Sequence, residues 1–213
     1  MKSIPISKPV LGKEEEDKIL EAVKSTWISS KGPFLDSFSK SFSEFCGTKY
    51  ASTVCNGTAA LHLALLALGI KPGDEVIVPD FTFAATANAV IYCGARPVLA
   101  DVNLETGCME MENLLPHVSK KTKAIIPVHL YGHPCKMDEI MEFANSKGIW
   151  VVEDAAESHG AEVLGKRVGS FGHIGCFSFY GNKIITTGEG GMCTTNDAGL
   201  FDKMELFKNH GMT

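Results

Sequence analysis

Short runs of apolar residues alternate along most of the chain with longer segments whose apolar residues recur at helical spacing. The runs are rich in β-branched residues and end at polar residues or glycine, which is typical of strands. They predict strands over residues 51–55, 75–79, 97–100, 124–128, 149–153, 176–180 and 191–195. The segments between them predict helices over residues 59–68, 84–93, 109–118, 137–146 and from just after 197 to about 208. This alternation indicates an α/β fold with a mostly parallel sheet that is flanked by helices.

The pattern before residue 50 is different. Helix-like segments over residues 13–24 and 34–45 are separated by a polar turn over residues 26–33. We therefore expect an N-terminal helical arm over residues 1–50, followed by one α/β domain over residues 51–213.

Composition limits the classes of partner. The 213 residues are 45% hydrophobic and 21% charged, which is ordinary for a globular protein. The net charge of −5 and the lack of a long Lys/Arg run indicate neither nucleic acid nor an anionic membrane as a partner. The N-terminus lacks the features of a signal peptide, and the apolar stretch over residues 59–70 is too short to cross a bilayer, so we expect a cytoplasmic protein.

The cysteines and histidines carry no recognisable metal or disulfide pattern. The chain has seven cysteines, an odd number, and no pair has the C-x-x-C spacing. Among the seven histidines only His129 and His133 have the H-x-x-x-H spacing, and Gly132 and Pro134 beside them do not suit the helix on which such a pair binds a metal. We therefore expect neither a disulfide framework nor a metal site.

Residues 56–61 (NGTAAL) join a predicted strand to an apolar helix. Small residues at such a turn let backbone N–H groups face an anion, and the helix dipole favours negative charge there. The alternative is a simple helix cap, because Thr58 is a good capping residue.

Two charged residues follow predicted strands. Asp154 comes directly after the strand at 149–153, where its carboxylate could stabilise the protonated nitrogen of a pyridine cofactor or simply cap a turn. Lys183 lies in a Gly/Thr-rich loop after an apolar strand, where burial would make its amine nucleophilic. The alternative for Lys183 is an exposed loop lysine. The 29 residues from Asp154 to Lys183 leave room for a hairpin and a return strand.

Several segments in combination resemble the nucleotide-sugar aminotransferases of the DegT/StrS type, which are fold-type I enzymes dependent on pyridoxal phosphate (PLP). The segments that carry the resemblance are residues 55–61 (CNGTAAL), 73–83 (GDEVIVPDFTF), 152–157 (VEDAAE), 178–183 (SFYGNK) and 188–191 (GEGG). The resemblance covers nearly the whole chain. Residues 152–157 and 178–191 are most similar to the perosamine synthases of that family, which aminate the 4-keto position of a GDP-linked deoxysugar.

The resemblance implies a role for each matching residue. Lys183 would form the Schiff base with PLP and move a proton, Asp154 would pair with the ring nitrogen, and Phe83 would stack on the ring. Backbone groups of Gly57, Thr58 and Ala59 and the hydroxyl of Ser178 would hold the phosphate. Glu157 would lie near the ring hydroxyl, a position where many relatives have Gln or His.

The resemblance also implies a fold-type I large domain without its C-terminal small domain, because relatives extend well beyond this length. In them the small domain and a second subunit complete the active site, so we expect a homodimer and an incomplete enzyme in the 213 residues alone. Glutamate would be the amino donor and a nucleotide-linked keto-sugar the acceptor, for surface polysaccharide or amino-sugar synthesis. The alternatives are another fold-type I enzyme, such as a lyase, and a non-catalytic PLP-binding fragment or subunit.

Overall fold

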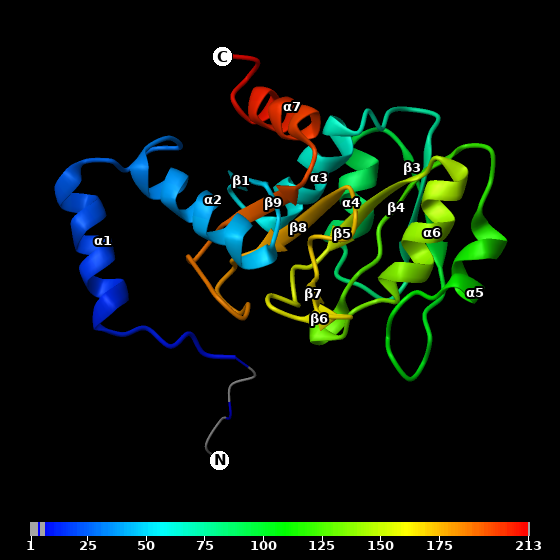
Figure 1. Ribbon diagram of the computed structural model, residues 1–213, viewed down its shortest axis with the longest axis horizontal. Helices are drawn as coiled ribbons and strands as arrows, with labels where there is room; N and C mark the ends of the chain where they lie inside the picture. Colours follow the sequence, from blue (N-terminus) through cyan, green and yellow to red (C-terminus); the bar gives the residue numbers. More distant parts are fainter. Residues whose placement is uncertain (1–3, 5–6, 213) are drawn as a thin grey trace.

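A computed structural model describes Ile4 and residues 7–212, and one seven-stranded sheet forms the middle of three layers (Figure 1). Its strands are β1 Tyr50–Val54, β2 Glu75–Pro79, β3 Arg96–Ala100, β4 Thr122–Ile125, β5 Trp150–Asp154, β8 Ile174–Ser178 and β9 Gly191–Thr195. The strand order is β1-β9-β8-β5-β4-β2-β3. Only β9 runs antiparallel to its neighbours, so the prediction of a mostly parallel α/β sheet is confirmed.

Helices cover both faces of the sheet. One face packs against α3 (Gly57–Ala67), α4 (Ala85–Tyr92) and α7 (Ala198–Lys208), and the other packs against α2 (Pro33–Cys46), α5 (Met111–Leu114) and α6 (Met137–Lys147). Successive residues of a strand point to opposite faces. In β2, Val76 and Val78 therefore join the first core, whereas Ile77 joins the second.

Proline explains two differences from the expected elements. The helix expected over residues 109–118 is the short α5 followed by a 3-10 turn at Leu115–His117, because Pro116 cannot donate to an α-helical ladder. The strand expected over residues 124–128 ends at Ile125, before Pro127, although Val128 pairs again with Asp154.

The segment between β5 and β8 contains the hairpin for which the sequence left room. Its strands are β6 (Glu162–Val163) and β7 (Lys166–Arg167), and the chain then returns to the sheet as β8, parallel to β5. β8 begins and ends two residues earlier than expected, so the chain leaves the sheet after Ser178.

The two N-terminal helices differ in how they attach to the sheet. α1 (Lys13–Ser25) buries none of its residues and stands away from the other layers (Figure 1). In contrast, α2 places Phe42 edge-on against Phe177 and Phe179, with ring centroids 4.9 and 5.2 Å apart. The aromatic side chains of α2 therefore belong to the core beneath β8.

Glu153 is a fully buried carboxylate on the β5 face opposite Asp154. Its Oε1 accepts from the backbone N–H groups of Phe171 and Gly172 at 2.8 and 2.6 Å. Its Oε2 accepts from the N–H of Gly169 at 2.7 Å and lies 3.0 Å from His129 Nε2. These bonds fix the loop that leads into β8, and they satisfy a charge that would otherwise be costly to bury.

The imidazole of His129 is oriented by its own backbone contact. Its Nδ1 accepts from the N–H of Cys135 at 3.1 Å, so Nε2 carries the proton and donates to Glu153. A neutral histidine in this tautomer supplies one donor to the carboxylate without adding a second buried charge.

Replacing Glu153 with Gln is expected to destabilise the fold by about 2–4 kcal/mol, because the new NH₂ group faces two N–H donors in either orientation. The midpoint of urea unfolding measures the change. The matched control is Glu162→Gln in the exposed hairpin, where loss of the bond to Arg167 should cost less than about 1 kcal/mol. Equal midpoints for the two variants would contradict the role given to Glu153.

His159 is buried among the rings of Phe42, Phe177 and Phe179, at centroid distances of 6.4, 5.4 and 5.5 Å. Neither of its ring nitrogens has a hydrogen-bond partner among the described residues. Burial, opposed by the nearby carbonyl of Ser178 and assisted by the charge of Lys183, lowers the pKa of His159 to about 4.

This lowered pKa predicts a loss of stability in acid. Below about pH 6.5 the unfolded state gains a proton on His159 that the folded state does not bind until about pH 4, so stability falls by about 1.4 kcal/mol per pH unit. In His159→Phe, the difference in unfolding free energy between about pH 7 and about pH 5 should shrink by about 2 kcal/mol. His210→Phe, at an exposed position, is the control, and an unchanged difference in His159→Phe would refute the prediction.

Candidate functional site

A cavity of about 350 Å³ lies at the carboxyl ends of β5 and β8, beside the N-terminus of α3. Ligands of open α/β sheets gather at this edge. Most of the residues expected to form the site line the cavity, namely Gly57, Thr58, Phe83, Asp154, Glu157, Ser178 and Lys183.

The N-terminus of α3 supplies backbone donors to this cavity. The cap is Asn56, whose Oδ1 accepts from the N–H of Ala59 at 2.9 Å, and not Thr58 as the alternative interpretation of this turn had it. The N–H groups of Gly57 and Thr58 have no partner within the helix, because they belong to its first turn. They are therefore available to an anion in the cavity.

Close packing explains the glycine at the start of α3. A Cβ on Gly57 would lie 2.7 Å from the Cβ of Ser178, at the end of β8. The hydroxyl of Ser178 accepts only a long bond of 3.4 Å from the N–H of Tyr180, which leaves its proton free to donate. The helix terminus and this hydroxyl thus lie side by side.

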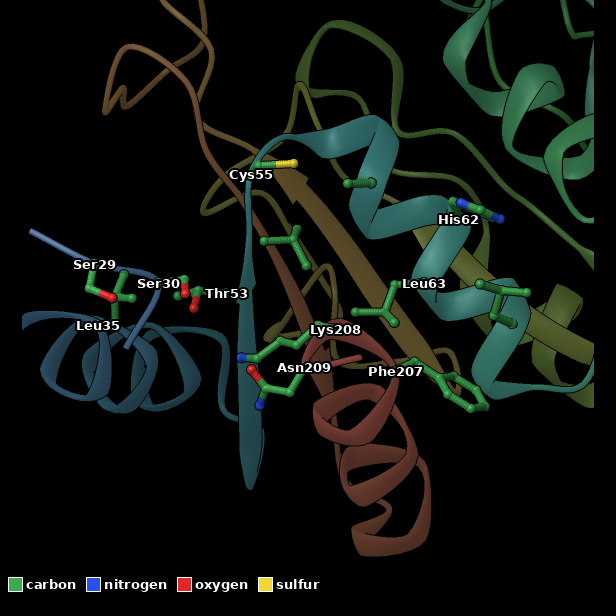
Figure 2. Close-up of a pocket in the computed structure, with 13 residues that line it drawn as sticks. Ser29, Ser30, Leu35, Thr53, Cys55, His62, Leu63, Phe207, Lys208 and Asn209 are labelled. Atoms are coloured by element: carbon green, nitrogen blue, oxygen red, sulfur yellow. The ribbon is translucent and has the colours of Figure 1, made fainter. Parts of the chain in front are cut away.

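Ala59 is the one predicted site residue that lies elsewhere. It lines a second cavity of about 540 Å³ (Figure 2), and its N–H is already bonded to Asn56. Ser29 and Ser30, from the polar turn between the two N-terminal helices, also line this second cavity. In Figure 2 they face Thr53 of β1, on the side of α3 occupied by α7.

Asp154 is the last residue of β5, and its carboxylate is buried where it lines the cavity. Its Oδ2 accepts from the hydroxyl of Thr86 at 2.8 Å, and its Oδ1 accepts from the N–H of Ala156 at 3.2 Å. Burial raises the pKa of Asp154, whereas these two hydrogen bonds and the positive charge of Lys183 oppose the rise. A cation in the cavity would favour the ionised carboxylate further.

Lys183 lies in the turn after β8, where its N–H donates to the carbonyl of Tyr180 at 2.9 Å. Its Nζ is 3.1 Å from Glu157 Oε1, and the two side chains are 17% and 27% exposed. The alternative of a freely exposed loop lysine is therefore wrong. Glu157, expected near a ring hydroxyl, is the partner of this amine in the structure.

A second contact holds Glu157 from its other oxygen. The N–H of Tyr131 donates to Glu157 Oε2 at 3.1 Å. Tyr131 has a φ of 50°, which is uncommon for a residue with a side chain and costs about 1–3 kcal/mol. The backbone conformation that aims this N–H at Glu157 is one that the local sequence does not favour.

Sequence reasoning missed three contributors to the cavity and its surroundings. Asn56 is a favoured N-cap residue, so its position before Gly57 could have identified it. Thr86 lies within a predicted helix, and Tyr131 acts through its backbone. Neither of these two carries a signal in a single sequence, because each is defined by a residue far away along the chain.

The cavity therefore combines complementary groups. Backbone donors and a hydroxyl at the start of α3 suit an anion, the carboxylate of Asp154 suits a cation, and Lys183 supplies an amine. Phe83 adds an aromatic ring that is largely exposed at the cavity. A flat, charged ligand with a phosphate at one end and a cationic ring at the other matches this set.

Comparisons with known proteins agree with the geometry. GDP-perosamine synthase of Escherichia coli O157:H7 is 51% identical over 212 residues, which cover 100% of this chain and 58% of the relative. An aminotransferase structure from Psychrobacter cryohalolentis superposes with a TM-score of 0.93 at 43% identity, covering 97% of this chain and 53% of that one. The structure of a putative sugar aminotransferase from Streptococcus pneumoniae in its PLP form superposes with a TM-score of 0.94 at 30% identity, covering 100% of this chain and 59% of that one.

The chain thus spans little more than half the length of these relatives. The family match itself extends over residues 9–213 and includes every residue that lines the cavity. On this evidence the chain belongs to the DegT/DnrJ/EryC1/StrS aminotransferase family.

Proposed function

We propose that the whole protein is a PLP-dependent aminotransferase that moves an amino group from glutamate to a nucleotide-linked keto-deoxysugar. The observation that carries the proposal is the pair of Lys183 and Glu157, 3.1 Å apart, in one cavity with the buried Asp154. Membership of the aminotransferase family supports the same reaction class.

The donor set of the cavity fits PLP. The N–H groups of Gly57 and Thr58 and the hydroxyl of Ser178 would hold the phosphate, and Asp154 would hold the ring nitrogen. The contact between Gly57 and Ser178 leaves no room for a Cβ, so these donors stay together. Bound PLP would supply an aldehyde that links to amines and a ring that withdraws electrons.

The protein side chains would then position groups and move protons. Lys183 would place its amine where it can take a proton from a substrate carbon and return it, which is general acid–base work. Glu157 would hold that amine in the cavity, and Tyr131 would hold Glu157. Phe83 would cover one face of the flat ligand.

For the acceptor we propose a GDP-linked 4-keto-deoxysugar, as in a perosamine synthase. Its support is the 51% identity to a GDP-perosamine synthase over the whole of this chain. The product would serve surface polysaccharide or amino-sugar synthesis, a role that the name of a spore coat polysaccharide biosynthesis protein from Bacillus subtilis, 45% identical, also supports.

We further propose a homodimer, in which residues 1–50 form a helical arm and residues 51–213 the large cofactor-binding domain. Exposed apolar residues around Lys183 support the dimer, because a surface of this kind is usually covered by a partner. They are Phe83, Tyr131, Tyr180, Ile184 and Ile185, each of which lines a cavity that Lys183 also lines.

We propose the cytoplasm as the location. All seven cysteines are free thiols, which suits a reducing compartment. Among the described residues, the helices lack the length and apolar character needed to cross a bilayer.

The reaction is tested with the protein at the full length of its relatives, loaded with PLP and given glutamate and a GDP-linked 4-keto-deoxysugar. We expect 2-oxoglutarate and a GDP-linked amino-sugar in equal amounts. Lys183→Ala should lower the rate by about 10³-fold, because the proton carrier is lost. Lys166→Ala, at an exposed lysine of the hairpin, should leave the rate unchanged.

Other products would contradict the proposal in distinct ways. Cleavage or elimination products without 2-oxoglutarate would indicate a lyase of the same fold. PLP binding without turnover, together with copurification of an active partner, would indicate a non-catalytic subunit. Failure with every keto-sugar nucleotide would exclude a sugar aminotransferase.

The dimer is tested by sedimentation of the same full-length protein, where we expect twice the monomer mass. Ile184→Glu places a charge in the exposed apolar surface and should shift the protein toward monomer. Leu115→Glu is the control, because Leu115 lies in the 3-10 turn that contacts the far edge strand β3. A monomeric wild type, or equal dissociation in both variants, would disprove the assignment of this surface.

A further inference from the structure

Two threonine hydroxyls form a line that ends on Asp154. The hydroxyl of Thr86, in the first turn of α4, lies 2.8 Å from Asp154 Oδ2. The hydroxyl of Thr82, in the turn before α4, lies 3.0 Å from that of Thr86. Thr86 is fully buried, whereas Thr82 lines the same cavity as Asp154 and Lys183.

The proton positions in this line follow from the number of donors. An ionised carboxylate only accepts, so the single hydroxyl proton of Thr86 must go to Asp154. The oxygen of Thr86 is then an acceptor for Thr82, which donates to it. The order Thr82 to Thr86 to Asp154 is therefore fixed while Asp154 carries its charge.

Packing alone does not require a hydroxyl at position 86. Thr86 lies on the face of α4 that also carries Ala89 and Val90 into the apolar core. Valine has nearly the shape of threonine and would fill the same space. The hydroxyl is placed in an apolar layer, and its protein partners are Asp154 and Thr82.

We infer that Thr86 is a positioning residue for Asp154 and that Thr82 supports Thr86. The two hydroxyls together orient the carboxylate toward the cationic ring nitrogen of PLP and keep it ionised. This inference rests on the proposed function. It extends the site into α4, an element to which sequence motifs assigned no chemistry.

The electrostatic reason is that the carboxylate is buried. Burial alone favours the protonated form of Asp154, which could not pair with a cationic nitrogen. Thr86 supplies a donor to one oxygen and the N–H of Ala156 supplies a donor to the other. With both donors in place, the carboxylate is fixed in one orientation and its remaining lone pairs are left for the ligand.

The test compares two ligands on matched variants. Dissociation constants are measured by fluorescence for PLP and for its analogue with a ring carbon in place of the ring nitrogen. Thr86→Val should weaken PLP binding by roughly 10- to 100-fold, the usual value of a hydrogen bond to a charged group. It should leave binding of the analogue nearly unchanged, because the analogue has no cationic nitrogen.

Two further variants identify the hydroxyl as the cause. Thr86→Ser keeps the donor and should bind PLP like the wild type. Thr82→Val removes only the second hydroxyl and should weaken PLP binding by a smaller factor, about threefold. An equal loss of affinity for both ligands in Thr86→Val would show that Thr86 acts through packing. Unchanged affinity for both ligands would show that the hydrogen bonds from Thr82 through Thr86 to Asp154 have no role in cofactor binding.

A measurement without cofactor separates this inference from the proposed function. The carboxyl carbon of Asp154 is followed by NMR during acid titration of the cofactor-free protein. Thr86→Val should raise the pKa of Asp154 relative to the wild type and to Thr86→Ser. Absence of PLP binding in the wild type would overturn the proposed function, whereas an unmoved pKa in Thr86→Val would overturn the inference by itself.

Discussion

The buried carboxylate of Glu153 is the constraint on which the arrangement of the site depends. Three backbone N–H groups from the loop before β8 and one imidazole N–H converge on it. These bonds tie the return strand to β5 from the face opposite the cavity. Since β8 delivers both Ser178 and the turn that carries Lys183, a charge on one face of the sheet determines where the reactive groups lie on the other.

Asp154, next to Glu153 on β5, is bonded in a different way. Asp154 is one residue further along β5 and therefore points to the other face. Glu153 has every lone-pair direction occupied by protein donors, whereas Asp154 has one donor to each oxygen and still lines a cavity. Of these adjacent acidic residues, one is fully bonded within the fold and the other faces the cavity, and the difference follows from the number of donors that each one meets.

The sequence was sufficient for the fold class and for most of the cavity. Apolar runs and glycine positions identified every strand of the main sheet. The order of Thr58, Asp154 and Lys183 along the chain indicated a site at the carboxyl ends of the strands. The contacts that were not expected are interactions that a single sequence does not display. The N–H of Ala59 bonds to the cap Asn56, and the carboxylate of Glu157 pairs with Lys183. The roles of Ala59 at the phosphate and of Glu157 at the ring hydroxyl stay predictions. Thr86 and His129 could not have been found, because their partners are 68 and 24 residues away.

Tyr131 holds Glu157 through its backbone N–H, while its ring is 80% exposed. The backbone of Tyr131 therefore contacts Glu157, whereas its side chain faces the solvent. Substitutions that accept the left-handed backbone conformation would leave the contact to Glu157 intact while changing the surface that borders the cavity. The side chain at position 131 is therefore free to differ among members of the family while the contacts of Glu157 are kept.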